Sequence, residues 1–312
     1  VTDVACYGDS TGSVNLSVTG GTLPYTFLWS NEAETEDISG VPAGSYSVTV
    51  SDSNGCTILA SASVEQPAEA LTGSIVSLTH VSEHGESNGS ITVSGSGGRS
   101  PYSYSLDEGE FQPSGTFGSL SAGSYSIRVM DASSCIFIIP FVINQPDPLI
   151  ISISGQTNVA CFGENTGSVS VTATGGVSPY TYRLDTGPFQ DNGSFGSLSA
   201  GDYIITVRDA NNCERQIQVE ITLPEAALSG TVIVTDVACY GDSTGSVDLS
   251  VTGGTLPYTF LWSNEAETED ISGVPAGSYS VTISDSTGCT IHASASVEQP
   301  AAALTGSIVT IT

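Results

Sequence analysis

The sequence repeats itself, and this constrains the fold more than any other feature. Residues 1–79 recur as residues 234–312 with seven differences. Two more divergent copies lie between them, because the phrase VACYGDSTGS at 4–13 returns as VSEHGESNGS at 81–90 and as VACFGENTGS at 159–168. A period of about 78 residues indicates an array of small structural units, each of which contacts only its neighbours.

A proline ends each copy and sets the expected boundaries. We number the copies repeat 1 to repeat 4 and expect them at 1–68, 69–146, 147–224 and 225–301. Repeat 4 is the near-copy of repeat 1, so the order restarts after three repeats, as in a window cut from a longer array. Residues 302–312 are expected to form the first strand of a following repeat, whereas the first strand of repeat 1 is expected to be incomplete. No flexible linker separates the copies, which predicts a rod-like array.

Apolar and polar residues alternate along each copy, which is the pattern of half-buried β-strands. In repeat 1 the alternation runs through Val14–Val18, Tyr46–Val50 and Ile58–Val64. Glycine-containing turns such as Gly20-Gly21 and Asn54-Gly55 interrupt it. We therefore predict an all-β protein, in which each repeat is a small immunoglobulin-like antiparallel β-sandwich of about seven short strands.

A tyrosine follows the same Ala-Gly turn in every copy: Tyr46, Tyr125, Tyr203 and Tyr279. Two interpretations are open. The tyrosine forms a corner in which its hydroxyl bonds back to the backbone, or it is an ordinary core residue.

The composition excludes several functions. Five basic residues, all arginine, stand against 33 acidic ones, for a net charge of −28. Such a surface repels phosphate backbones, so we expect no nucleic-acid partner. The longest apolar run, 135–143, contains Pro140 and is too short to cross a bilayer, so no membrane span is expected.

Seven cysteines point to an oxidising compartment outside the cytoplasm. Three copies hold a pair at matching positions: Cys6/Cys56, Cys161/Cys213 and Cys239/Cys289. We predict a disulfide within each of these repeats. Zinc is the alternative, although the cysteines are widely spaced and repeats 1 and 3 contain no histidine. In repeat 2 Glu83 replaces the first cysteine, so we expect Cys135 to be a buried free thiol, with an intermolecular bridge as the alternative.

No constellation for catalysis recurs along the chain. The three histidines are His80, His84 and His292, and a repeated active site cannot depend on them. A Ser-His-Asp arrangement remains open only in repeat 2. We expect no enzyme, no catalytic residue and no cofactor.

Two further ligand classes are alternatives. Acidic, glycine-punctuated loops such as 52–55, and the acidic run 32–37, have oxygens that suit Ca²⁺, although Asp, Asn, Ser and Gly are also ordinary turn residues. Aromatic rings after Pro24, Pro101 and Pro179 would stack on sugars if exposed, but alternate spacing favours the core.

A set of positions recurs at fixed spacing in most copies; in repeat 1 they are Cys6, Gly8, Gly12, Gly20, Gly21, Pro24, Tyr25, Ala43, Gly44, Tyr46, Asp52, Cys56, Gln66 and Pro67. This pattern resembles the SprB-type repeat over nearly the whole chain, and departs from it at Glu83. The resemblance implies very large cell-surface adhesins of gliding Bacteroidetes, exported by the type IX system and moved along the outer membrane as filaments. It implies no catalytic residues.

We therefore expect a structural segment, or shaft, of a long extracellular filament or adhesin at the bacterial cell surface, serving adhesion or gliding. Its main partners would be neighbouring repeats of the same chain. One alternative is a glycan- or surface-binding module in each repeat. Another is a subunit of a self-assembling extracellular polymer, because an unfinished first strand and a spare last strand suit strand exchange between molecules.

Overall fold

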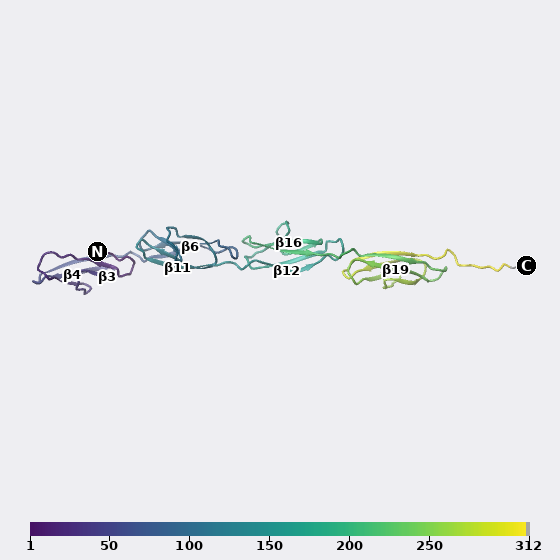
Figure 1. Cartoon of the computed structure of the whole chain (residues 1–312), viewed down its shortest axis with the longest axis horizontal. Helices are drawn as coiled ribbons and strands as arrows, with labels where there is room; N and C mark the ends of the chain where they lie inside the picture. Colours follow the sequence, from purple (N-terminus) through teal and green to yellow (C-terminus); the bar gives the residue numbers. More distant parts are fainter. Residues whose placement is uncertain (310–312) are drawn as a thin grey trace. The chain divides into compact units, whose positions relative to one another are not determined.

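The computed structural model describes residues 1–309, and this part of the chain consists of β-strands joined by turns and loops, with no helix (Figure 1). The prediction of an all-β protein is confirmed. The alternating apolar pattern explains why, because it gives each strand one apolar face to bury.

The strands follow the order of the repeats. Repeat 1 contains β1 (Gly12–Val14), β2 (Thr26–Trp29), β3 (Ile38–Val41), β4 (Gly44–Ser51) and β5 (Thr57–Val64). Repeat 2 contains β6 (Thr72–Thr79), β7 (Gly89–Ser96), β8 (Ser103–Leu106), β9 (Thr116–Leu120), β10 (Gly123–Met130) and β11 (Ile136–Ile143). Repeat 3 contains β12 (Ile150–Thr157), β13 (Gly167–Thr174), β14 (Thr181–Leu184), β15 (Ser194–Leu198), β16 (Gly201–Arg208) and β17 (Glu214–Ile221). Repeat 4 contains β18 (Ser229–Thr235), β19 (Gly245–Thr252), β20 (Thr259–Trp262), β21 (Ile271–Val274), β22 (Gly277–Ser284) and β23 (Thr290–Val297).

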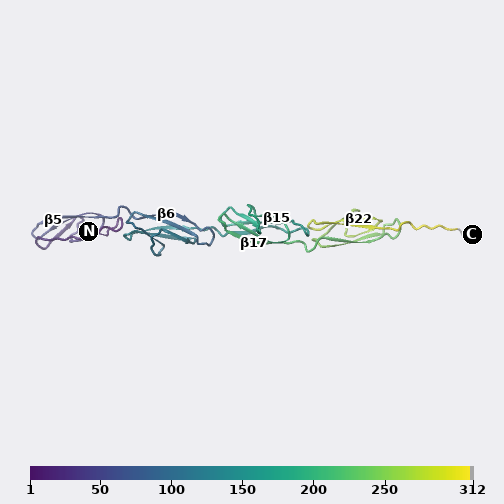
Figure 2. The same ribbon diagram turned by 90° about the horizontal axis from the view of Figure 1, so that it is seen from above.

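Each repeat folds into two antiparallel sheets that enclose one core (Figure 2). In repeat 2 the sheets are β6-β7-β9 and β8-β10-β11, and repeats 3 and 4 have the same strand orders. This is an immunoglobulin-like sandwich, with six strands in each of repeats 2 to 4 and five in repeat 1, rather than the seven expected. Repeat 1 has β2-β4-β5 opposite a sheet of only two strands, β1-β3.

The cores form where the alternating apolar side chains of the two sheets meet. In β10, Ile127 and Val129 are fully buried, whereas Arg128 between them is not. Each repeat has its own cluster of buried side chains. Trp29 and Trp262 lie within two of these clusters, so the aromatic rows face the core, as the alternate spacing favours.

Each recurring tyrosine forms a tyrosine corner, which was one of the two interpretations of this position. The hydroxyl of each donates a hydrogen bond to the carbonyl oxygen four residues upstream, at 2.8–3.1 Å. The acceptors are Pro42, Ser121, Ser199 and Pro275. The bond satisfies a partly buried hydroxyl at the start of a central strand.

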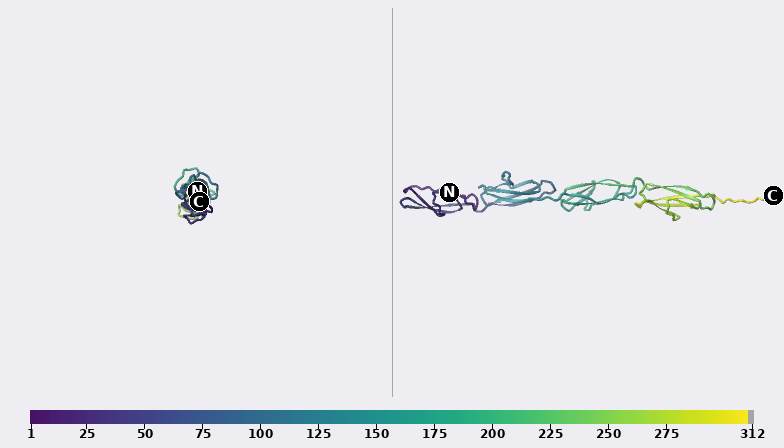
Figure 3. Two further views of the ribbon diagram at one scale, coloured as in Figure 1. Left: turned by 90° about the vertical axis from the view of Figure 1, so that its left-hand side faces the viewer. Right: turned by 60° about the horizontal axis from the view of Figure 1, so that its bottom comes forward.

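The two ends of a repeat are far apart. We call the end where the first strand begins the leading end, and the opposite end, where the last strand finishes, the trailing end. In repeat 2 the first strand β6 and the last strand β11 contact each other, and both run from the leading to the trailing end. The strands lie along the length of each repeat (Figure 3). Eight residues at about 3.3 Å each separate the two ends by about 26 Å. This separation decides which cysteines can meet.

The chain divides into two compact units, Val1–Asp147 and Pro148–Thr312. Each unit contains two repeats, and the finer boundaries within it remain a prediction. After β23, the segment 303–309 is exposed and belongs to no strand. Residues 310–312, the end of the expected following strand, lie outside the described residues. Within residues 1–309 there is no helix long and apolar enough to cross a membrane.

Candidate functional site: the linked repeat ends

The first cysteine of each pair lies in a tight turn at the trailing end of its repeat. In repeat 1 the N–H of Asp9 donates to the carbonyl of Cys6 at 3.1 Å, and Gly8 has φ of +83°. Glycine is required at this position because the third residue of a type II turn has positive φ. The side chain of Gln66 accepts the N–H of Gly8 at 2.9 Å, which explains why a Gln-Pro pair ends the repeat.

The second cysteine lies in the hairpin between the last two strands, at the leading end. In repeat 4 the Asp285 carboxylate accepts the N–H groups of Thr287 and Cys289, both at 2.9 Å. Its other oxygen accepts the N–H of Thr255 at 2.9 Å. The aspartate therefore holds the hairpin in shape and ties it to the neighbouring glycine turn, which sequence reasoning did not assign to it.

These hydrogen bonds set the acidity of two of the aspartates. The backbone N–H of Cys56 is the main cause that lowers the pKa of Asp52 below its usual 3.8. For Asp285, burial raises the pKa, but hydrogen bonds from the Thr287 hydroxyl and the backbone of Thr255 and Cys289 outweigh it, so the pKa is lowered. In both cases hydrogen bonds donated to the carboxylate favour its charged form and so lower its pKa.

Disulfides join neighbouring repeats within each unit. Cys6 of repeat 1 bonds to Cys135 of repeat 2, with a Cα–Cα distance of 5.7 Å. Cys161 of repeat 3 bonds to Cys289 of repeat 4, with a Cα–Cα distance of 5.6 Å. In both cases a first cysteine at a trailing end meets the second cysteine at the next leading end.

The predicted disulfides within repeats are therefore wrong in this structure. Cys56 and Cys239 are exposed thiols, and Cys213 is buried and belongs to neither disulfide. Cys135 is not the expected free thiol. The physical reason is the length of the sandwich, since a disulfide needs its two Cα atoms within about 7 Å and the two ends of one repeat are about 26 Å apart.

One signal in the sequence pointed to this arrangement. Repeat 2 has lost its first cysteine to Glu83 and kept its second, Cys135. If the first and second cysteines of one repeat were partners, the loss of the first would leave the second without a partner. Pairing between repeats removes the difficulty, because Cys135 has its partner in repeat 1.

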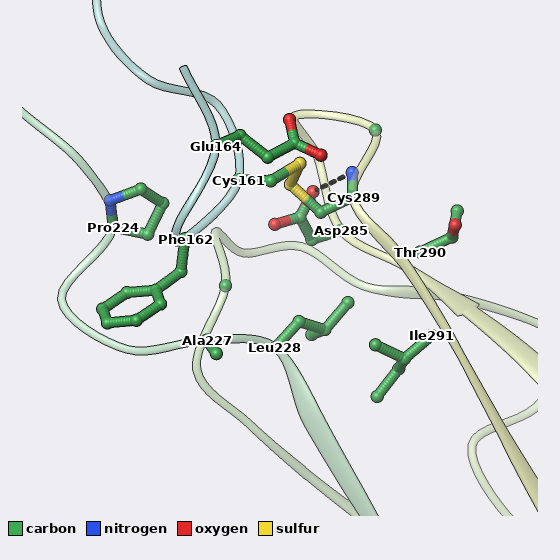
Figure 4. A pocket seen from close by; sticks show the side chains of 12 residues that line it. Cys161, Phe162, Glu164, Pro224, Ala227, Leu228, Asp285, Cys289, Thr290 and Ile291 are labelled. Atoms are coloured by element: carbon green, nitrogen blue, oxygen red, sulfur yellow. Dashed lines mark hydrogen bonds between the residues drawn. A yellow bond between two sulfur atoms is a disulfide. The ribbon is translucent and has the colours of Figure 1, made fainter. Parts of the chain in front are cut away.

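A small cavity lies beside the disulfide of the second unit (Figure 4). It has a volume of about 320 Å³, and Phe162, Leu228 and Ile291 contribute its apolar wall. Glu164 and Asp285 contribute carboxylates. A smaller cavity of about 160 Å³ lies beside Cys6–Cys135. Glu86, in the trailing turn of repeat 2, stands where Glu164 stands in repeat 3.

The acidic loops use their oxygens within the fold. Asp52 oxygens accept N–H groups of its own hairpin, and Asp37 of the acidic run accepts the N–H of Leu16 at 2.8 Å. Within residues 1–309 no three His, Cys, Asp or Glu side chains are grouped so as to hold a metal ion. Asp37 and Asp52 therefore serve as bridging and turn residues in these loops.

The three histidines are dispersed. In repeat 2 the Nδ1 atom of His80 accepts the N–H of Asn144 at 3.1 Å, and the ring of His84 lies 3.1 Å from the carbonyl of Pro146. His292 bonds to Thr282 on the neighbouring strand of repeat 4. These contacts connect chain segments near the strand ends and assemble no Ser-His-Asp group with the described partners.

The comparison with known families agrees with this repeat architecture. The SprB repeat family matches residues 1–34, 84–111, 153–189 and 231–267. The chain carries four SprB repeats. Each match covers the first cysteine turn, or the residues just after it, together with the strands that follow, so the trailing-end turn lies in the shared part of these SprB repeats. No curated protein matches the chain.

The solved structures that are similar to this chain include several with immunoglobulin domains. The chain is 14% identical to Sidekick-1 immunoglobulin domains 1–5, over 96% of this chain and 78% of that one, with a TM-score of 0.34. It is 14% identical to three N-terminal domains of the outer capsid protein Hoc of bacteriophage RB49, over 74% and 100%, with a TM-score of 0.40. A tetra-tandem repeat from the extending region of a large adhesion protein is 15% identical over 88% and 91%, with a TM-score of 0.26.

Proposed function

We propose that these SprB repeats form the shaft of a long adhesin outside the bacterial cell, which serves surface attachment or gliding. The observation that carries the proposal is the use of the recurring residues. The first cysteine, the second cysteine and the Asp52-type aspartate all serve to join or shape the ends of repeats.

The disulfides at the repeat ends support a location outside the cytoplasm. Disulfides persist in oxidising compartments and are rare where thiols are kept reduced. The net charge of −28 keeps such a surface soluble and repels other acidic surfaces. Export by the type IX system and movement with the gliding machinery belong to this proposal through the resemblance of the repeats.

A glycan-binding role for each repeat has less support. Trp29 and Trp262 are 3% and 2% exposed, and Tyr104 and Tyr182, in the corresponding strands of repeats 2 and 3, are buried. Sugar recognition by stacking needs a ring with an open face. The rings of these rows pack in the cores instead.

Labelling of intact cells tests the shaft proposal. An antibody raised against residues 1–79 is expected to bind living cells of the source bacterium and, in gold-labelled electron micrographs, to mark surface filaments at several points along their length. Labels at filament tips alone would favour a binding tip instead. Labels that enter only permeabilised cells would contradict the proposal.

A further inference from the structure

The cavity beside the Cys161–Cys289 disulfide has two carboxylates at one end, one from each of the linked turns (Figure 4). Glu164 belongs to the turn of Cys161, because its N–H donates to the carbonyl of Cys161 at 3.1 Å. Asp285 belongs to the hairpin of Cys289, whose N–H it accepts at 2.9 Å. The end of the cavity at the disulfide is therefore negatively charged.

The two carboxylates differ in what they have left to bind. Both oxygens of Asp285 accept backbone N–H groups, from Thr255 on one side and from Thr287 and Cys289 on the other. Among the described residues the side chain of Glu164, which lies on the surface, has no hydrogen bond or ion pair. Glu164 can therefore accept hydrogen bonds from a ligand, and Asp285 adds a fixed negative charge beside it.

The rest of the cavity wall is largely apolar and held in place by the fold. Leu228 and Ile291 line it and also pack against the core of repeat 4, so their positions are fixed. Pro224 and the ring of Phe162 line it from repeat 3, and Phe162 is 51% exposed. A ligand that fills this space would meet charge at one end and hydrocarbon along its length.

Size and chemistry together limit what can bind. A volume of about 320 Å³ is at the small end of the range for ligand pockets, which suits a small molecule or a single side chain. The carboxylates repel anions. Calcium needs six to eight oxygen ligands, and the described part of the chain groups no three metal-ligating side chains. An organic cation with a hydrocarbon stem would use both the charged and the apolar part of the wall.

The corresponding cavity in the first unit lacks these properties. Its volume is about 160 Å³, and Asp131 lines it, whereas Asp9, which stands at the place of Glu164, does not. The oxygens of Asp131 accept the N–H groups of Arg99 and Cys135, both at 2.9 Å. The first unit thus has no open carboxylate in this cavity, so we restrict the inference to the second unit.

We propose that the cavity beside Cys161–Cys289 binds an alkylammonium group, as carried by the lysine side chains of other proteins and by free diamines. The nitrogen would lie at Glu164 and Asp285, and the stem along Leu228 and Ile291. This chain has no lysine, so no lysine side chain of its own can fill the cavity. The inference goes beyond the shaft proposal, since it assigns a ligand to one junction between repeats.

Titration of the purified chain with n-butylammonium chloride at constant ionic strength tests the inference. In nuclear magnetic resonance spectra we expect saturable shifts of the backbone amides of 161–164 and 285–291. Affinity should rise about two- to fourfold for each methylene from methylammonium to butylammonium, because each one buries hydrocarbon on the apolar wall. 1-Butanol has the same stem without the charge and should bind about tenfold more weakly.

A matched pair of variants separates this site from general attraction of cations to an acidic chain. Glu164→Gln keeps the shape of the side chain and removes its charge, so it should weaken butylammonium binding by about tenfold. Glu267→Gln removes one charge from an exposed position of repeat 4 that does not line the cavity, and should leave the affinity unchanged. Because both variants have the same net charge, an equal loss in the two would overturn the proposal.

Two further ligands identify the source of the ammonium group. Tighter binding of Nα-acetyl-lysine methylamide would support a lysine side chain as the ligand, and tighter binding of cadaverine would support a free diamine. The proposal fails if the shifts do not saturate, if they spread over the acidic loops of all four repeats, or if affinity does not depend on the length of the stem. None of these results bears on whether antibodies find the protein on cells.

Discussion

At the scale of single residues, the recurring aspartate and cysteine form one structural device. The aspartate shapes the hairpin that presents the second cysteine, because its carboxylate accepts the backbone N–H of that cysteine. An Asp followed four residues later by Cys therefore indicates a thiol whose place in the hairpin is fixed by that Asp. The sequence alone showed that this aspartate recurs. It did not show the hydrogen-bond partners of the two carboxylate oxygens, because one of them lies in the glycine turn, which is distant in the sequence.

The lowered pKa of Asp285 predicts a pH dependence with a definite sign. A carboxyl whose pKa is lower in the folded than in the unfolded state stabilises the fold above its ordinary pKa of 3.8, and loses this contribution as the pH falls below that value. Asp285→Ala should reduce the free energy of unfolding of the second unit by about 1–3 kcal/mol at neutral pH. Urea unfolding of the variant and the parent chain should give curves that converge in strong acid. An equal difference at both pH values would contradict the role assigned to the charge.

At the scale of the element, a strand forms here only where it has a neighbour. Backbone N–H and C=O groups without a partner are left to water, so the strand ends where pairing ends. Repeats 1 and 4 isolate this effect, because the sequences of β1 and β19 match almost completely. Periodicity predicted both as strands, and it contains no information about which one has a partner.

Hydrogen exchange should report this difference directly. Amides of residues 15–19 are expected to exchange much faster than those of 248–252, because the latter lie in β19 and pair with β18. Mass spectrometry distinguishes the two peptides by Asn15 and Asp248. Equal protection of both segments would contradict the explanation that pairing with β18 makes β19 longer than β1.

The link between repeats can be tested by counting thiols. In the unfolded, unreduced chain we expect Cys135→Ser to add one thiol that reacts with maleimide, and peptide mapping should identify it as Cys6. If Cys6 were bonded to Cys56 and Cys135 were a free thiol, this substitution would instead remove one reactive thiol. Cys161→Ser is the matched experiment in the second unit and should expose Cys289.

The extent of prediction from sequence differs between fold and site. The period, the all-β class, the sandwiches and the buried aromatic rows followed from spacing and alternation. The cysteine pairing did not, because equal spacing in every copy is compatible with pairing inside a repeat and with pairing to the next one. Only the length of the sandwich distinguishes pairing within a repeat from pairing between repeats. In the sequence, the replacement of the first cysteine of repeat 2 by Glu83 was the one sign of pairing between repeats.

At the scale of the whole molecule, charge dominates the response to solution conditions. Acidic groups outnumber arginines 33 to 5, and two ion pairs, both to Glu214, occur within the described residues. Self-repulsion of this size destabilises compact states, and salt screens it. We expect the melting temperature to rise with ionic strength.

Calcium provides a sharper form of the same experiment. Calcium chloride and sodium chloride at equal ionic strength should raise the melting temperature equally, because the described residues group no three metal-ligating side chains. A larger rise with micromolar calcium would indicate a specific site and contradict our account of the acidic loops.

The disulfides between repeats also limit how far the chain can be stretched. Cys6 and Cys135 are 129 positions apart, and Cys161 and Cys289 are 128 apart. At about 3.4 Å per residue, each bond withholds about 440 Å of contour length from a pulling force. Tension applied at the two termini passes through the sulfur atoms and bypasses the polypeptide between them. Only the residues before Cys6, between Cys135 and Cys161, and after Cys289 are left to extend, so an oxidised molecule pulled from its ends behaves as a nearly inextensible tether.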